Sequence, residues 1–173
     1  MTRTEAIRRL RMLAKERAFG CQMGRQVGSD RLIQTGLDAL LANVDSPSIP
    51  LLAGLGKKEE PEAPELFDRV VDELGLTYRL PVDLDDARWA LARWWALLIA
   101  DGDVDPATGA DMIWVEAAME LGYPEVLQPI VEWAIILGDW NEEWDITIDE
   151  IRSNILTAAH DLLTRLPQSP PEP

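Results

Sequence analysis

The chain has 173 residues, and its 31 Asp and Glu against 16 Lys and Arg give a formal net charge of −15 at pH 7. This length suits one domain with a core of its own, and a hydrophobic content of 47% argues against disorder. The net negative charge disfavours nucleic-acid binding by the main body, because phosphate contacts need clustered cations. The chain has one Cys and one His, so it can form neither an internal disulfide nor a Cys/His zinc cluster.

Two further features concern the compartment. No segment approaches the roughly 20 apolar residues of a membrane span. The basic N-terminus also lacks the apolar block of a signal peptide. We therefore expect a cytoplasmic protein with no membrane span.

Charge is unevenly distributed along the chain. Residues 1–31 hold eight Lys or Arg and three Asp or Glu, a net charge of +5, so the remaining 142 residues carry −20. This predicts a basic helical arm over 1–28, an acidic all-α globular domain over 29–166, and a Pro-rich disordered tail over 167–173. Three interpretations of the arm stay open: it docks onto the acidic body, it binds an anionic partner, or it is an artefact of the assigned start codon.

The spacing of apolar residues predicts the first elements. A helix over 4–18 ends before a glycine-punctuated segment that begins at Gly20. A second helix runs from its N-cap Ser29 to about Asn43. Ser46-Pro47-Ser48 then provides a cap and a proline that starts a short helical turn.

The middle of the chain contains its most apolar helix. After a linker-like stretch over 57–64, a helix ends at Leu74 before Gly75. The next helix, over about 84–100, is apolar on nearly all sides, which predicts a central position. Five tryptophans lie on apolar helix faces and are expected in the core. They are Trp89, Trp94, Trp95, Trp114 and Trp133.

Caps delimit the last three helices. Asp105-Pro106 begins a helix to Leu121, and a helix over 124–137 contains Pro129, which kinks it or marks its true start. The capping box from Thr147 to Glu150 begins a final helix that ends near Leu166. No convincing strand pattern appears. The sequence predicts an all-α fold, a compact bundle of six or seven helices around a central Trp-rich helix.

Asp101, Asp103 and Asp105 resemble the start of a calcium loop, in which oxygens at positions 1, 3 and 5 converge on the ion. Pro106 stands where the loop needs Gly, and Met112 where it needs a bidentate Glu. Helix capping and the helix dipole explain the three acids equally well. We expect no metal site and no cofactor.

No residue pattern indicates catalysis. Cys21 and His160 could form a nucleophile and its base, but a surface His and a half-buried Cys explain them better. Gly20, Gly24 and Gly28 follow no strand and do not match a phosphate-binding loop. We assign no catalytic residue, although this does not exclude an enzyme.

The most unusual local feature places two tryptophans among four acids between two predicted helices. Its candidate partner-binding residues are Asp139, Trp140, Glu142, Glu143, Trp144 and Asp145. Tryptophan is enriched at binding hot spots, and an acidic rim suits a basic partner. In the alternative interpretation, the two tryptophans fix the loop to the core while the acids face water.

Several blocks of the sequence resemble a group of small uncharacterised actinobacterial proteins that are all-helical, over about residues 32–165. The blocks include Leu37-Asp38-Ala39-Leu40-Leu41, Ser46-Pro47-Ser48, Glu59-Glu60-Pro61-Glu62-Ala63, Arg88-Trp89-Ala90 through Trp94-Trp95, and Asp101-Gly102 through Asp105-Pro106. These motifs are helix boundaries and core aromatics, so the resemblance implies no activity, ligand or catalytic residue. Proteins of this size and character are often immunity or inhibitor proteins.

The leading hypothesis is a non-catalytic protein-binding module whose acidic surface covers a basic partner, as an immunity or inhibitor protein does. The alternative is a small-ligand-binding protein or enzyme with a pocket between helices. A deep pocket lined by tryptophan would favour the alternative. The sequence leaves the oligomeric state open.

Overall fold

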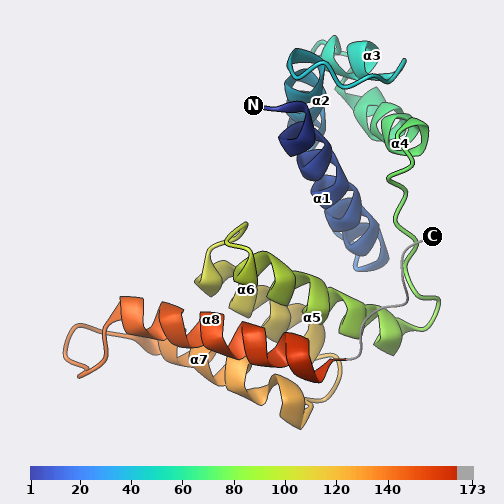
Figure 1. Cartoon of the computed structure of the whole chain (residues 1–173). Coiled ribbons are helices and arrows are strands. Elements are labelled where there is room, and N and C mark those ends of the chain that lie inside the picture. The colour runs from blue at the N-terminus through green and yellow to red at the C-terminus, as the bar shows by residue number, and fades with distance from the viewer. Residues whose placement is uncertain (167–173) are drawn as a thin grey trace. The chain divides into compact units, whose positions relative to one another are not determined.

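The computed structural model describes residues 1–166 and confirms the all-α prediction, with eight α-helices and no strand in that range (Figure 1). The predicted Pro-rich tail, 167–173, lies outside the described residues. The chain divides into two compact units, Met1–Leu80 and Pro81–Pro173. No helix of the described part is long and apolar enough to cross a bilayer.

The first unit contains four α-helices around one core. They are α1 (Arg3–Gln22), α2 (Ser29–Leu41), α3 (Ile49–Ala53) and α4 (Ala63–Glu73), with a short 3₁₀ turn at Glu60–Glu62. Helix α1 is longer than predicted at both ends. Thr2 and Glu5 form a capping box at its start, and Gly24, with φ of 72°, ends it, while Gly20 stays inside the helix.

Helix α1 belongs to the core of the first unit. Its apolar residues Ala6, Leu10, Leu13 and Ala14 are buried in one cluster with residues of α2, α3 and α4. Its cations pair within the same unit: Arg17 donates two hydrogen bonds to Asp68, at 2.8 and 2.9 Å. The predicted boundary after residue 28 therefore differs from the observed one between Leu80 and Pro81, because the apolar face of α1 needs α2 and α4 to leave water.

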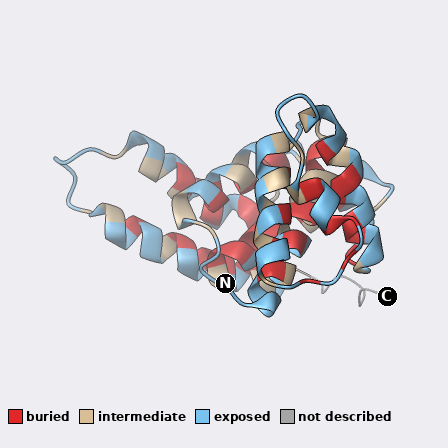
Figure 2. Ribbon diagram, turned by 90° about the horizontal axis from the view of Figure 1, so that it is seen from above, coloured by how far each residue is buried: buried red, intermediate tan, exposed pale blue. Residues whose placement is uncertain are grey.

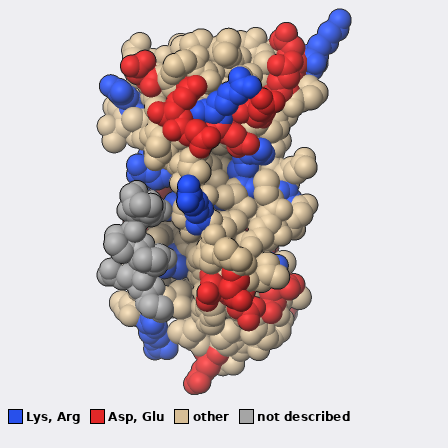
Figure 3. Space-filling view, turned by 90° about the vertical axis from the view of Figure 1, so that its right-hand side faces the viewer, with Lys and Arg blue, Asp and Glu red and all other residues tan. Residues whose placement is uncertain are grey.

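This division changes the charge map. Residues 1–80 contain twelve Lys or Arg and twelve Asp or Glu, so the first unit has no net charge. Residues 81–173 contain four Lys or Arg and nineteen Asp or Glu, so the second unit carries the whole net charge of −15. Figure 3 shows one face of the molecule, on which acidic side chains gather in separate groups. The whole net negative charge thus belongs to the second unit.

Ser48 is the N-cap residue of the short helix α3, but its side chain makes no capping hydrogen bond, and Pro50 rather than Pro47 lies in the first turn. The hydroxyl of Ser46 donates to Glu73 Oε2 at 2.5 Å, and that of Ser48 donates to Glu73 Oε1 at 2.6 Å. The backbone N–H of Ser48 also donates to Oε2, at 3.0 Å. These bonds tie the segment before α3 to the C-terminal end of α4.

The second unit contains the other four α-helices. They are α5 (Leu84–Ala100), α6 (Pro106–Ile113), α7 (Gln128–Asp139) and α8 (Ile148–Arg165), with a π-helical segment at Trp114–Ala118 and a 3₁₀ turn at Glu125–Leu127. Helix α5 packs against both α6 and α8, as its apolar surface predicted. The predicted caps Asp105 and Thr147 are present.

Two helix boundaries in this unit bear on the predicted ones: the end of α6 differs from the prediction, and the start of α7 decides between the two roles predicted for Pro129. The helix predicted over 105–121 is α-helical only to Ile113 and continues as the π-helical segment. Pro129 lies in the first turn of α7, where its missing N–H costs no hydrogen bond, so it marks the true start of that helix. The tryptophans are less buried than predicted: Trp94 and Trp95 are buried, whereas Trp89, Trp114 and Trp133 are half-buried.

Candidate functional site

The acidic loop with its two tryptophans joins α7 to α8. These helices pack side by side as a hairpin, and the loop 140–147 closes its end (Figure 1). In Figure 2 this loop, at the left, is pale blue, because all its residues from Asn141 to Asp145 are exposed. The six predicted partner-binding residues therefore lie together at the end of one hairpin.

Trp140 fixes the loop. It is the C-cap of α7, with an extended backbone (φ −59°, ψ 140°) that turns the chain out of the helix. Its indole Nε1–H donates to the carbonyl of Ile146 at 2.7 Å, and its side chain is half-buried. The hydrogen bond spans the base of the loop and holds its two ends together.

Trp144 presents its side chain to solvent, with 41% of the residue exposed. A local turn positions it: the Asn141 side chain accepts from the backbone N–H of Glu143 at 2.9 Å, and the backbone N–H of Trp144 donates to the Asn141 carbonyl at 3.2 Å. The two tryptophans thus divide between the two interpretations of the sequence, since Trp140 fixes the loop and Trp144 is a large apolar surface group.

The acids around Trp144 are exposed and meet few cations. Asp139, Glu142, Glu143 and Asp145 are all exposed. The sequence contains no Lys or Arg between Arg93 and Arg152, a signal that the sequence analysis missed. The Nε of Arg152 lies 3.5 Å from Oδ1 of Asp105. The end of the hairpin is therefore a region of negative potential around an aromatic side chain.

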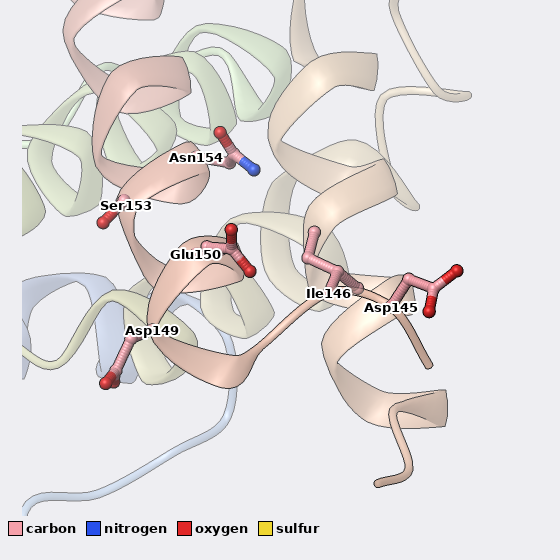
Figure 4. Close-up of a pocket in the computed structure, with 6 residues that line it drawn as sticks. All are labelled: Asp145, Ile146, Asp149, Glu150, Ser153 and Asn154. Carbon is pink, nitrogen blue, oxygen red and sulfur yellow. The ribbon is translucent and has the colours of Figure 1, made fainter. Parts of the chain in front are cut away.

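A shallow groove of about 400 Å³ opens beside the loop. Its lining residues come from the end of the loop and the first two turns of α8: Asp145, Ile146, Asp149, Glu150, Ser153 and Asn154. Figure 4 shows Glu150 and Asn154 on the side of α8 that faces Ile146. Hydrogen bonds from the backbone and hydroxyl of Thr147 lower the pKa of Glu150 below its ordinary value.

The candidate calcium loop is used for helix capping. The Asp105 carboxylate accepts from the backbone N–H groups of Ala107 and Thr108 at 3.1 and 3.3 Å, which starts α6. Gly102, with φ of 73°, follows the C-cap of α5. Within residues 1–166, no group of three His, Cys, Asp or Glu side chains is arranged to hold a metal ion.

Cys21 and His160 belong to different units, and both are exposed. Cys21 is more exposed than the half-buried position expected for it. It lies near the end of α1, beside a cavity of about 200 Å³ that Arg17, Phe67, Asp68 and Tyr78 also line. The guanidinium of Arg17 and the carboxylate of Asp68 pair with each other at this cavity.

Known proteins add no family assignment to this geometry. Comparisons with family models, with curated proteins and with solved structures gave no significant match.

Proposed function

We propose that the second unit is a non-catalytic protein-binding module that binds a basic partner through the end of the α7–α8 hairpin. The observation that carries the proposal is Trp144, a 41% exposed tryptophan held by a hydrogen-bonded turn among four exposed acids. An apolar group that a partner can bury, surrounded by charge that attracts that partner, is the usual composition of a binding hot spot and its rim.

The charge of the unit supports the same partner chemistry. All of the net −15 belongs to residues 81–173, so the long-range field favours approach of a cationic protein. A module of this kind acts by covering a basic surface of its partner, as an immunity or inhibitor protein does. The resemblance to small actinobacterial proteins is compatible with such a role and supplies no residue for it.

Two variants at the hairpin end test the proposal. The full-length chain serves as bait in an extract of its native host, and binding kinetics are then measured with the purified partner. Charge reversal of Glu142 and Glu143 to Lys slows association and flattens its salt dependence. Trp144→Ala speeds dissociation, by about 30-fold if the side chain contributes about 2 kcal/mol as a hot spot.

The matched control reverses two exposed acids of the same unit outside the hairpin, Asp111 and Glu120, to Lys. It makes the same change in net charge and leaves dissociation unaltered. Melting temperatures of all variants accompany the kinetics. If Trp144→Ala mainly lowers the melting temperature, and the Glu142 and Glu143 reversal binds the partner normally, this site is not the interface.

A further inference from the structure

The groove beside the loop 140–147 has two sides of different origin. One side is the N-terminal part of α8, and the other is Ile146 in the loop. Figure 4 shows the side chains of Glu150 and Asn154, one helical turn apart, pointing from α8 toward Ile146. The side chains of Asp149 and Ser153 point to another side of the helix. A carboxylate, an amide and an aliphatic side chain therefore face the interior of the groove.

Hydrogen bonds hold both sides of the groove in place. The carbonyl of Ile146 accepts from the indole Nε1–H of Trp140 at 2.7 Å, which ties this residue to the end of α7. On the other side, the backbone N–H and the hydroxyl of Thr147 donate to Glu150 Oε2, at 2.8 and 2.9 Å. Both of these bonds end on Oε2, so the capping box fixes the carboxylate without occupying its Oε1.

The polar groups of the groove suit a ligand with hydrogen-bond donors and a positive charge. A carboxylate oxygen only accepts hydrogen bonds, and the amide of Asn154 can turn its oxygen toward the same ligand. No Lys or Arg lies between Arg93 and Arg152. The Nε of Arg152 lies 3.5 Å from Oδ1 of Asp105, so this guanidinium is engaged outside the groove. The cation that complements Glu150 therefore has to come from another molecule.

Of the two strongly basic side chains of proteins, arginine matches the groove better than lysine. Its guanidinium carries five N–H donors in a fixed planar fork, so it can bond acceptors on two successive helical turns. Its aliphatic stem and its weakly hydrated faces can also contact Ile146. The ammonium of lysine is a compact and strongly hydrated point charge, which gains little from an aliphatic wall.

The size and position of the groove indicate a side chain presented by a protein. Its volume of about 400 Å³ is near the lower end of the range for ligand pockets, about 300–1,000 Å³. Asp145 lines the groove, and Trp144 directly precedes Asp145 in the chain. A partner that inserts one side chain into the groove can therefore cover Trp144 with a neighbouring apolar residue.

We propose that this groove binds an arginine side chain of the basic partner, with the guanidinium at Glu150 and Asn154 and the aliphatic stem against Ile146. The inference rests on the proposed function and specifies its partner: a protein that presents an exposed arginine beside an apolar group for Trp144. Charge around the loop attracts the partner, and the groove selects the type of cation.

Three short peptides that differ in one residue test the choice of ligand. Each is an acetylated and amidated tripeptide with glycine on both sides of arginine, lysine or citrulline, the neutral analogue of arginine. They are titrated into the isotope-labelled full-length chain at physiological salt, which screens long-range attraction. The resonances of the Asn154 side-chain amide are followed by NMR. The arginine peptide is expected to bind at least about threefold more tightly than the lysine peptide, and the citrulline peptide is expected to cause no shift.

A matched pair of variants locates the contact. Glu150→Gln removes the charge in the groove and keeps the capping box, because Gln serves at this position as Glu does. Asp161→Asn removes one exposed carboxylate farther along α8, outside the groove. The first substitution is expected to weaken binding of the arginine peptide by at least about tenfold, and the second to leave it within about twofold of the parent. Asn154→Leu, followed through the backbone resonances of α8, is expected to make the arginine and lysine peptides bind equally.

Several results would overturn the inference and leave the proposed function standing. Equal affinities of the parent chain for the arginine and lysine peptides would mean that charge alone attracts the partner. Unchanged binding of the arginine peptide by Glu150→Gln, or no shift of Asn154 at millimolar peptide, would place the contact elsewhere. Tighter binding of free arginine than of the peptide would assign the groove to a small molecule. The proposed function fails separately, by the kinetics of the Trp144 and Glu142/Glu143 variants with the purified partner.

Discussion

A methyl group added at Gly109 would test how tightly α5 and α6 pack. The Cβ of Gly109→Ala would lie 2.7 Å from Cδ1 of Ile99 and 3.1 Å from Cγ1 of Val104, and still closer to Cγ1 of Ile99. Ile99 is only 1% exposed, so its side chain has no free space to enter. Overpacking of this kind costs about 1–3 kcal/mol.

Helix propensity acts in the opposite direction, because Ala is favoured over Gly by about 1 kcal/mol in a helix. The expected sum is a loss of about 1 kcal/mol in the free energy of unfolding, which lowers the melting temperature of a unit this size by roughly 4–8 °C. The matched control is Gly138→Ala in α7, where a Cβ meets no atom within 4 Å. The Gly138→Ala variant changes helix propensity without adding a close contact, so it should raise the melting temperature.

Circular dichroism and calorimetry of the three proteins measure both effects. A rise in melting temperature for Gly109→Ala equal to that for Gly138→Ala would refute the reasoning, since α5 and α6 could not then be in close contact at this point.

Three other predictions concern the core, pH and metal ions. Trp94→Ala should lower the free energy of unfolding, measured by chemical denaturation, by about 3–5 kcal/mol, because Trp94 is only 8% exposed. Leu97→Ala on the same helix, at a residue that is 38% exposed, should lower it much less. Equal losses of stability in the two variants would contradict the central position of α5. Hydrogen bonds from Ser46 and Ser48 lower the pKa of Glu73, so this carboxylate stabilises the fold above its unfolded pKa of about 4.3 and ceases to do so as the pH falls through its lower folded pKa. The difference in melting temperature between the parent and Glu73→Gln should therefore be largest near neutral pH and become smaller in acid. A difference that does not change with pH would contradict this. Calcium or EDTA should leave the melting temperature unchanged, because Asp105 caps α6, and a rise of several degrees at micromolar free calcium would contradict this.

The candidate site could be located from the sequence because its features are local. Two tryptophans four residues apart, among acids and between two capped helices, indicate an unusual loop without any knowledge of packing. The different environments of Trp140 and Trp144 were not predictable in the same way. They depend on the indole hydrogen bond to Ile146 and on which side of the hairpin the core occupies.

Helix α7 shows the same limit more clearly. Glu132 is the only charged residue in the sequence from Gln128 to Gly138, and from periodicity alone such a helix would be placed inside a core. How far each apolar residue is buried depends on the neighbouring elements: Ile130, Val131 and Ala134 are buried, whereas Ile135 is 39% exposed. The three-dimensional structure is therefore needed to tell these residues apart.

Most of the helices could be predicted from the amino-acid sequence, because caps and helix ends depend on residues that are close together in the chain. Asp105-Pro106, the capping box of Thr147 and the positive φ of Gly75 lie where the residue types predicted them. The grouping of the helices into two units could be seen only in three dimensions. Composition suggested a basic arm on an acidic body, but the buried face of α1 packs with α2 and α4. Long-range apolar contacts, which leave no local pattern, therefore put the arm in a neutral first unit and left the whole net charge to the second.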